Sequence, residues 1–117
     1  MLPIIIVTVD EPLLFRQVLS YLGNPFTDMV KFVVDLKKNE MALGGELHAD
    51  AETILIERGS AQEDVWGANI YPSRDRLAWL EFTSLINIRP SQNNLGLLVQ
   101  SKQRQEDIRS LVNRLII

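Results

Sequence analysis

The stretch GGELHADAE (residues 44–52) carries four ionisable side chains at every second position: Glu46, His48, Asp50 and Glu52. A histidine among carboxylates can act as a general acid or base, because imidazole titrates near neutral pH and a carboxylate can orient it. In a strand, alternate side chains share one face and stand about 6.5–7 Å apart. If this stretch is extended, the four groups could therefore converge on one small molecule.

Two later segments would add polar groups to the same face. Residues 65–71 contribute Asn69 and Tyr71, and residues 78–89 contribute further acids, amides and Arg89. In the catalytic interpretation His48 transfers the proton and Arg89 stabilises developing negative charge. The catalytic candidates are His48, Glu46, Asp50, Glu81 and Arg89. The ligand-binding candidates are Glu52, Trp66, Asn69, Tyr71, Asn87 and Gln92.

Other interpretations of these residues stay open. His48 with nearby carboxylates would suit zinc, manganese or iron, but one histidine and no cysteine argue against it, so we expect no metal site and no cofactor. The acids could instead solvate a half-exposed sheet, with Arg89 pairing to Glu81 or Glu46 across strands. Trp66 and Trp79 could form a stacking platform, although burial in the core is the favoured interpretation.

The hydrophobic pattern predicts the elements that would position these groups. Strand-forming segments are 2–9, 30–36, 41–43, 65–71 and 78–89, and amphipathic helices are expected after an N-cap at Asp10 and over 106–117. Short connections between consecutive strands favour antiparallel pairing. We therefore predict one α+β domain over residues 1–117, with a four- to five-stranded, mainly antiparallel sheet and two helices on one face, in the order β-α-β-β-β-β-α.

Residues 46–57 fit two structures. As a strand, ELHADAE alternates small apolar and polar residues, but Ile54 and Ile56 then share the parity of the acids. As a helix, the segment has Asp50 as N-cap, Ile54 and Leu55 on one face, and Gly59 as its end. The composition of Thr-Ile-Leu-Ile favours the strand, and the candidate site depends on it.

Composition limits the class of protein. With 117 residues, the chain is long enough for one globular domain, and its net charge is −3. Because it has no cysteine, it has no disulfides and no thiolate metal sites. Residues 1–66 hold eleven acids and five Lys or Arg, whereas residues 67–117 hold four and seven. We expect a cytoplasmic protein with no signal peptide and no membrane segment. The net charge argues weakly against nucleic acid as a bulk electrostatic partner, and a local basic patch in the second half stays open.

Three blocks carry a resemblance to a known group of proteins. They are ALGGELHADAE (42–52), GSAQEDVWGANIYP (59–72) and EFTSLINIRPSQNN (81–94), and their order and spacing are similar to those of a family of short, uncharacterised bacterial proteins that is frequent in cyanobacteria. The similarity runs from about residue 28 to 94 and departs at Thr83, where the family has an acid. The resemblance implies a domain of unknown function and supplies no catalytic residues.

The sequence favours a binding function over catalysis, because a polar constellation is present without any complete catalytic signature. We predict a small binding or protein-interaction domain that uses the polar sheet face, with an unidentified small ligand or protein partner and a possible homodimer. The alternative is a metal-independent hydrolase or ribonuclease-like enzyme built on His48, the neighbouring carboxylates and Arg89.

Overall fold

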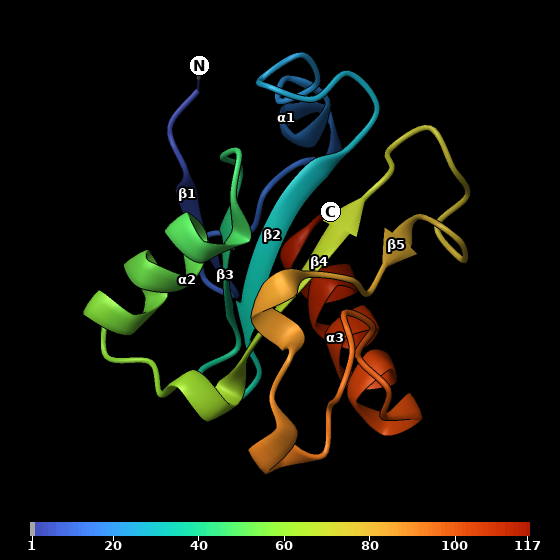
Figure 1. Cartoon of the computed structure of the whole chain (residues 1–117). Helices are drawn as coiled ribbons and strands as arrows, with labels where there is room; N and C mark the ends of the chain where they lie inside the picture. The colour runs from blue at the N-terminus through green and yellow to red at the C-terminus, as the bar shows by residue number, and fades with distance from the viewer. Residues whose placement is uncertain (1) are drawn as a thin grey trace.

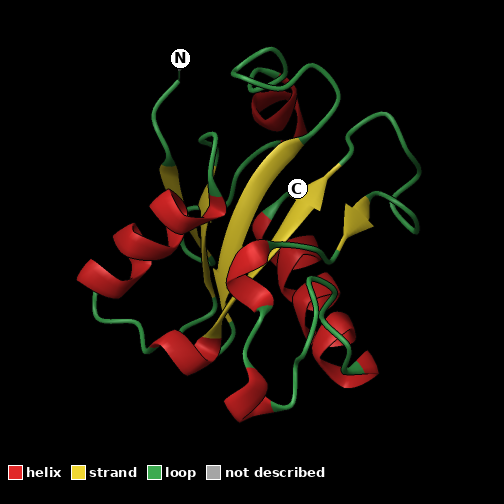
Figure 2. Ribbon diagram, in the orientation of Figure 1, coloured by secondary structure: helices red, strands yellow, loops and turns green. Residues whose placement is uncertain are grey.

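The computed structural model describes residues 2–117 and contains a five-stranded antiparallel sheet (Figure 1, Figure 2). The strands are β1 (Ile5–Thr8), β2 (Val30–Asp35), β3 (Glu40–Leu43), β4 (Val65–Ile70) and β5 (Leu80–Glu81). Their spatial order is β1-β3-β2-β4-β5, and every neighbouring pair is antiparallel. The predicted α+β class and antiparallel sheet are confirmed.

Helices lie on both faces of this sheet. The α-helices are α1 (Phe15–Leu19), α2 (His48–Glu57) and α3 (Lys102–Leu115), and the short 3₁₀ helices are η1 (Gln62–Asp64), η2 (Leu85–Asn87) and η3 (Pro90–Gln92). In Figures 1 and 2, α2 covers one face while α3 packs behind the other. None of the helices in the described part of the chain is long and apolar enough to cross a membrane.

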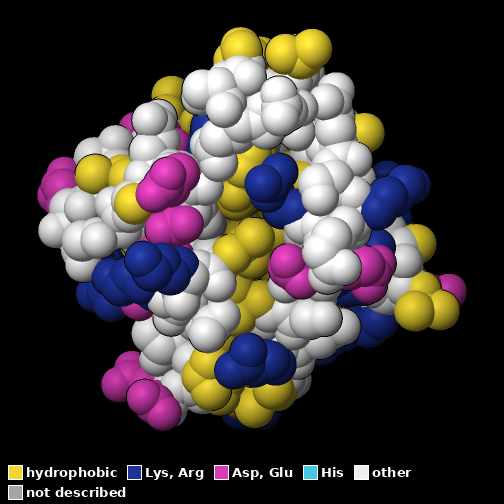
Figure 3. All heavy atoms as spheres, turned by 90° about the horizontal axis from the view of Figure 1, so that it is seen from below, with side chains coloured by type: hydrophobic (Ala, Val, Ile, Leu, Met, Phe, Trp, Pro, Cys, Tyr) yellow, Lys and Arg dark blue, Asp and Glu magenta, His cyan; other side chains and the backbone are white. Residues whose placement is uncertain are grey.

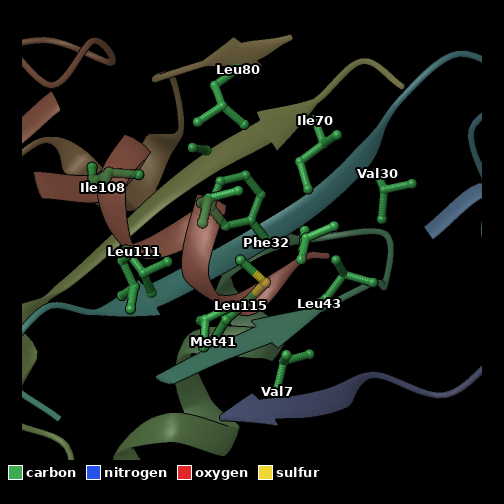
Figure 4. Packing of buried hydrophobic residues seen from close by; sticks show 14 of the residues in the cluster. Val7, Val30, Phe32, Met41, Leu43, Ile70, Leu80, Ile108, Leu111 and Leu115 are labelled. Carbon is green, nitrogen blue, oxygen red and sulfur yellow. The ribbon is translucent and has the colours of Figure 1, made fainter. Parts of the chain in front are cut away.

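The larger core lies between the sheet and α3. Phe32 and Met41 come from the neighbouring strands β2 and β3 and are fully buried. In Figure 4 these side chains point toward the inner face of α3, where Ile108 and Leu115 meet them. The apolar spacing that predicted a C-terminal amphipathic helix therefore identified the correct inward residues. The β2–β3 turn that sets this register has Asn39 in the left-handed conformation, with φ of 57°.

The strand prediction for residues 46–52 is wrong, because this segment begins helix α2. Ala51 and Leu55 are four positions apart and therefore lie on one side of the helix, where both are fully buried. They pack on Val33 and other small side chains of the sheet face opposite α3. The prediction that helices cover only one face fails for the same reason. The expected helix end is correct, since Gly59 has φ of 102°.

The predicted strand over 78–89 is also shorter than expected. Only β5 pairs with β4, and the chain then turns through η2 and η3. The side chains also point the opposite way from the prediction in this part. Asn87 and Arg89, which were expected on the polar face, are buried, and Ile88 is exposed.

The first helix begins later than expected. It starts after Leu14 rather than at Asp10, and the Gln17 side chain accepts a hydrogen bond from the Leu14 backbone N–H at 2.8 Å. The first strand, β1, lies at the edge of the sheet and is only partly buried, although a continuous apolar run is typical of a strand covered on both faces.

Candidate functional site

A pocket of about 350 Å³ opens between the first turn of α2 and the η2 segment. Its floor comes from β2 and β4, through Lys31 and Asn69. Its apolar walls are formed by Met29, Leu47, Ala49, Leu85, Ile86 and Leu97. Its remaining polar lining consists of His48, Thr83 and Ser84. The pocket thus combines a mainly apolar surface with a few polar groups, as small-molecule sites do.

His48 is the first residue of α2 and turns its ring inward from the helix end. Its Nε2 lies 2.9 Å from the carbonyl oxygen of Ala68 in β4. Because a carbonyl only accepts, Nε2 carries the hydrogen in this contact, and Nδ1 of the neutral ring is an acceptor. Burial lowers the pKa of His48 from its ordinary value of 6.5, and the positive charge of Lys31 lowers it further. The contacts with Ala68 and Asn69 raise this pKa, but burial has the largest effect.

Asn69 is held at the pocket floor by a cluster centred on Glu81. The Asn69 Nδ2 donates to Glu81 Oε1 at 2.9 Å and to the Thr83 carbonyl at 3.3 Å. The hydroxyls of Thr83 and Tyr71 donate to the same carboxylate oxygen at 3.1 and 3.3 Å. These bonds fix the orientation of the amide, so Asn69 Oδ1 is turned away from Glu81. This oxygen is buried and accepts no hydrogen bond from the described residues.

Positive charge meets this pocket from two sources. Lys31 is the one cation in β2, and its Nζ lies 5.0 Å from the centre of the Phe26 ring. It forms no ion pair with any acid in residues 2–117. The N-terminus of α2 has Leu47 as its N-cap residue, which offers no side-chain oxygen to the first-turn N–H groups. Those N–H groups therefore keep their partial positive charge.

Arg89 belongs to a different cluster, beside Glu52 of α2 and the start of η1, and does not line the pocket. Its guanidinium donates to the carbonyls of Gln62 at 2.6 Å, Ile86 at 3.1 Å and Val65. Three backbone segments are thereby joined by one side chain. Because its nitrogens are committed to these carbonyls, Arg89 acts here as a structural residue of the η1–η3 region. Burial lowers its pKa, which the nearby Glu52 partly offsets.

Trp66 and Glu52 complete the Arg89 cluster. Arg89 and Arg104 both stack on the Trp66 ring, with guanidinium carbons 4.3 and 4.2 Å from its centre. Glu52 Oε2 lies 3.8 Å from Arg89 Nη2 and accepts no hydrogen bond in the described part of the chain. Burial raises the pKa of Glu52, and Arg89 lowers it by a smaller amount. Gln92 accepts from Arg89 at 3.2 Å and donates to the Glu63 carbonyl at 3.0 Å.

The residues predicted as one site therefore fall into four groups. His48, Asn69, Tyr71 and Glu81 lie at or beside the pocket. The Arg89 cluster holds Arg89, Glu52, Trp66 and Gln92, and Asn87 is bonded to β4 through Gly67. Glu46 and Asp50 are exposed around the start of α2. The structure does not bring the five catalytic candidates together on a common face.

Sequence reasoning missed Lys31 and the apolar walls of the pocket. Lys31 did leave a signal, because it interrupts the run VKFVVD in a strand that is otherwise buried. A single cation in such a strand must reach a surface or a cavity. Leu85 and Leu97 left no comparable signal, since isolated leucines in loops have no periodicity to interpret.

Comparison with known proteins identifies a family for the chain but no activity. The family described as "Protein of unknown function (DUF5674)" matches residues 7–115, which confirms the resemblance to an uncharacterised family. No curated protein and no solved structure matches the chain. In residues 2–117, no three His, Asp or Glu side chains gather closely enough to hold a metal ion.

Proposed function

The chain belongs to the DUF5674 family, whose function is unknown, and we propose that it is a binding protein that takes a small molecule in the pocket between α2 and η2. One observation carries this proposal. The pocket has a volume of about 350 Å³, mainly apolar walls and a few converging polar groups. Small-molecule sites occupy the same range, which begins at about 300 Å³.

The exposed rim of the pocket supports this proposal. Leu47 is 55% exposed and Leu85 is 77% exposed, and both line the pocket from opposite sides. Two large apolar side chains that are exposed to water do not stabilise the sheet or α2. Exposed apolar residues that gather around a hollow are typical of binding surfaces.

The distribution of charge favours a small ligand over nucleic acid. The chain has a net charge of −3. On the face that Figure 3 shows, acidic and basic side chains are interspersed around a central strip of hydrophobic side chains. A phosphate backbone is bound by an extended basic surface, which this face does not present.

The geometry gives less support to the hydrolase alternative. His48 retains an unprotonated Nδ1 that could accept a proton, but the acids next to it in sequence, Glu46 and Asp50, are exposed. Arg89, the proposed stabiliser of negative charge, is committed to backbone carbonyls away from the pocket. A binding role requires neither of these groups and uses the residues that do line the pocket.

A variant with a filled pocket tests the proposal. Ala49 lines the pocket from an exposed helical position, so Ala49→Phe should occupy the cavity at little cost to the fold. Compounds that raise the melting temperature of the wild type should lose their effect in this variant. Ala78→Phe, at an exposed position away from the pocket, is the matched control and should behave as the wild type does. Ligands that stabilise Ala49→Phe equally would contradict the proposal.

A further inference from the structure

We infer that the pocket recognises a small acid with an apolar chain and a hydrogen-bond donor beside the acidic group, such as a 2-hydroxycarboxylate. This inference rests on the proposed function, because it assigns a ligand class to the same pocket. Two independent observations point to it: a cationic end formed by Lys31 and the start of α2, and a buried acceptor, Asn69 Oδ1, that lacks a donor.

The cationic end is the reason for inferring an acidic group on the ligand. The N–H groups of His48 and Ala49 are in the first turn of α2, where an α-helix has no internal acceptors for them. Among the described residues no other group accepts from these two N–H groups. An anion at this position is stabilised by the hydrogen bonds and by the helix dipole. Lys31 adds a full positive charge, because it lines the same pocket and forms no ion pair in residues 2–117.

Asp50 lies in the first turn of α2, but in residues 2–117 no carboxylate caps that turn by a hydrogen bond or pairs with Lys31. Glu46 and Asp50 are both exposed, and neither forms an ion pair with Lys31. Glu81, the acid nearest the floor, accepts from Asn69, Tyr71 and Thr83. Its charge is therefore compensated by three donors, and the cationic end stays available to a ligand.

Asn69 is the reason for inferring a hydrogen-bond donor on the ligand. Its side chain is only 5% exposed, and both of its amide hydrogens are used by Glu81 and Thr83. The remaining oxygen has no hydrogen-bond donor in residues 2–117, and Asn69 and His48 both line the pocket. His48 Nδ1 is itself an acceptor while Nε2 donates to Ala68. Two neighbouring acceptors without a donor are costly when buried, and a ligand hydroxyl or amino group would satisfy them.

The apolar walls account for the chain of the ligand. Leu47 and Leu97 are half-exposed on either side of the opening, and Ile86 lies deeper between them. Covering these side chains with an aliphatic chain removes apolar surface from water on both partners. A chain of about six carbons is compatible with a pocket of about 350 Å³.

Three matched probes separate the contributions. Isothermal titration of the wild type with 2-hydroxyhexanoate, hexanoate and hexane-1,2-diol compares a complete ligand with one that lacks the donor and one that lacks the acid. We expect 2-hydroxyhexanoate to bind most tightly, with hexanoate about five-fold weaker and the diol about ten-fold weaker, from the usual strengths of neutral and charge-assisted hydrogen bonds. Equal affinities for 2-hydroxyhexanoate and hexane-1,2-diol would overturn the inference.

Variants at Lys31 provide the second test. Lys31→Met should weaken 2-hydroxyhexanoate about five-fold or more while leaving the diol nearly unchanged, and Lys31→Arg should restore most of the affinity. Lys37→Met, at an exposed residue of the β2–β3 turn, makes the same change in net charge and should have no effect. An equal loss in Lys37→Met and Lys31→Met would also overturn the inference.

The outcomes distinguish this inference from the proposed function. If none of the three probes binds but other compounds stabilise the wild type and not Ala49→Phe, the ligand class is wrong and the pocket is still a binding site. If no compound of any class binds in the pocket, both fail.

Discussion

The side chain of Asn87 bonds to both backbone groups of Gly67: Oδ1 accepts from the Gly67 N–H at 2.9 Å and Nδ2 donates to the Gly67 carbonyl at 2.9 Å. A backbone amide of a neighbouring strand would make the same pair of bonds. β5 pairs with β4 only through Asn69 and Ile70, so Asn87 satisfies β4 further along the same edge. One amide side chain thereby holds η2, a wall of the pocket, against the sheet.

Replacing Asn87 should destabilise the fold. Asn87→Ala removes both bonds to Gly67 and a third from Nδ2 to the Leu97 carbonyl, and leaves buried backbone groups without partners. The expected loss in free energy of unfolding is about 2–4 kcal/mol, measured by urea denaturation. Gln100→Ala, at an exposed amide, should change it by less than about 0.5 kcal/mol. Similar small changes in both variants would contradict the structural role of Asn87.

Gly67 should tolerate no side chain. A Cβ at this position would lie 2.7 Å from the Ser84 Cβ, so Gly67→Ala forces β4 and the segment before η2 apart. We expect a loss of about 1–3 kcal/mol in thermal or urea unfolding, as for other overpacked sites. At Gly96→Ala the nearest atom is Gln100 Nε2 at 3.9 Å, so this control should be close to neutral. A neutral Gly67→Ala would show that the contact with Ser84 can relax.

Arg89 and Arg104 provide a matched pair, because both guanidinium groups stack on Trp66. Arg89→Lys loses the forked donation to three carbonyls, which a single ammonium cannot reproduce, and should cost about 2–4 kcal/mol of unfolding free energy. Arg104→Lys loses stacking alone and should cost less than about 1 kcal/mol. Equal losses of unfolding free energy in the two variants, measured by urea denaturation, would show that Arg89 stabilises the fold only through its contact with Trp66.

The stability of the protein should fall below neutral pH in a way that depends on His48. The unfolded chain protonates this residue near 6.5, whereas burial lowers the pKa in the folded state. The unfolded state therefore binds more protons in this window, so the contribution of the neutral ring is complete above pH 6.5 and decreases as the pH falls toward the folded pKa. Unfolding free energies from pH 8 to 5 should decrease more steeply for the wild type than for His48→Gln. Parallel curves would contradict a lowered pKa.

Some of the fold could be predicted from local patterns. The central strands and α3 were found because their apolar residues recur with the period of the element and face one continuous core. Helix α2 was assigned as a strand because Thr53 to Ile56 have strand-forming composition. Ala51 and Leu55 packing on the sheet outweigh that weak local preference.

The candidate site was harder to predict than the fold. Asn87 and Arg89 were expected to face a ligand, but both are buried and bond to backbone groups 20 to 27 residues earlier. A polar side chain that replaces a strand contact leaves no periodic pattern in the sequence. His48 was recognised by its chemistry, although its position at the start of a helix rather than in a strand gives it Lys31 and Asn69 as neighbours.

The most direct test of the binding pocket is a protein NMR titration that follows backbone amides and the His48 ring as compounds that stabilise the protein are added. We expect the shifts to concentrate on Lys31, His48, Ala49, Asn69 and Leu85 and to vanish in Ala49→Phe. Shifts that gather elsewhere on the molecule, or that persist in Ala49→Phe, would contradict this expectation.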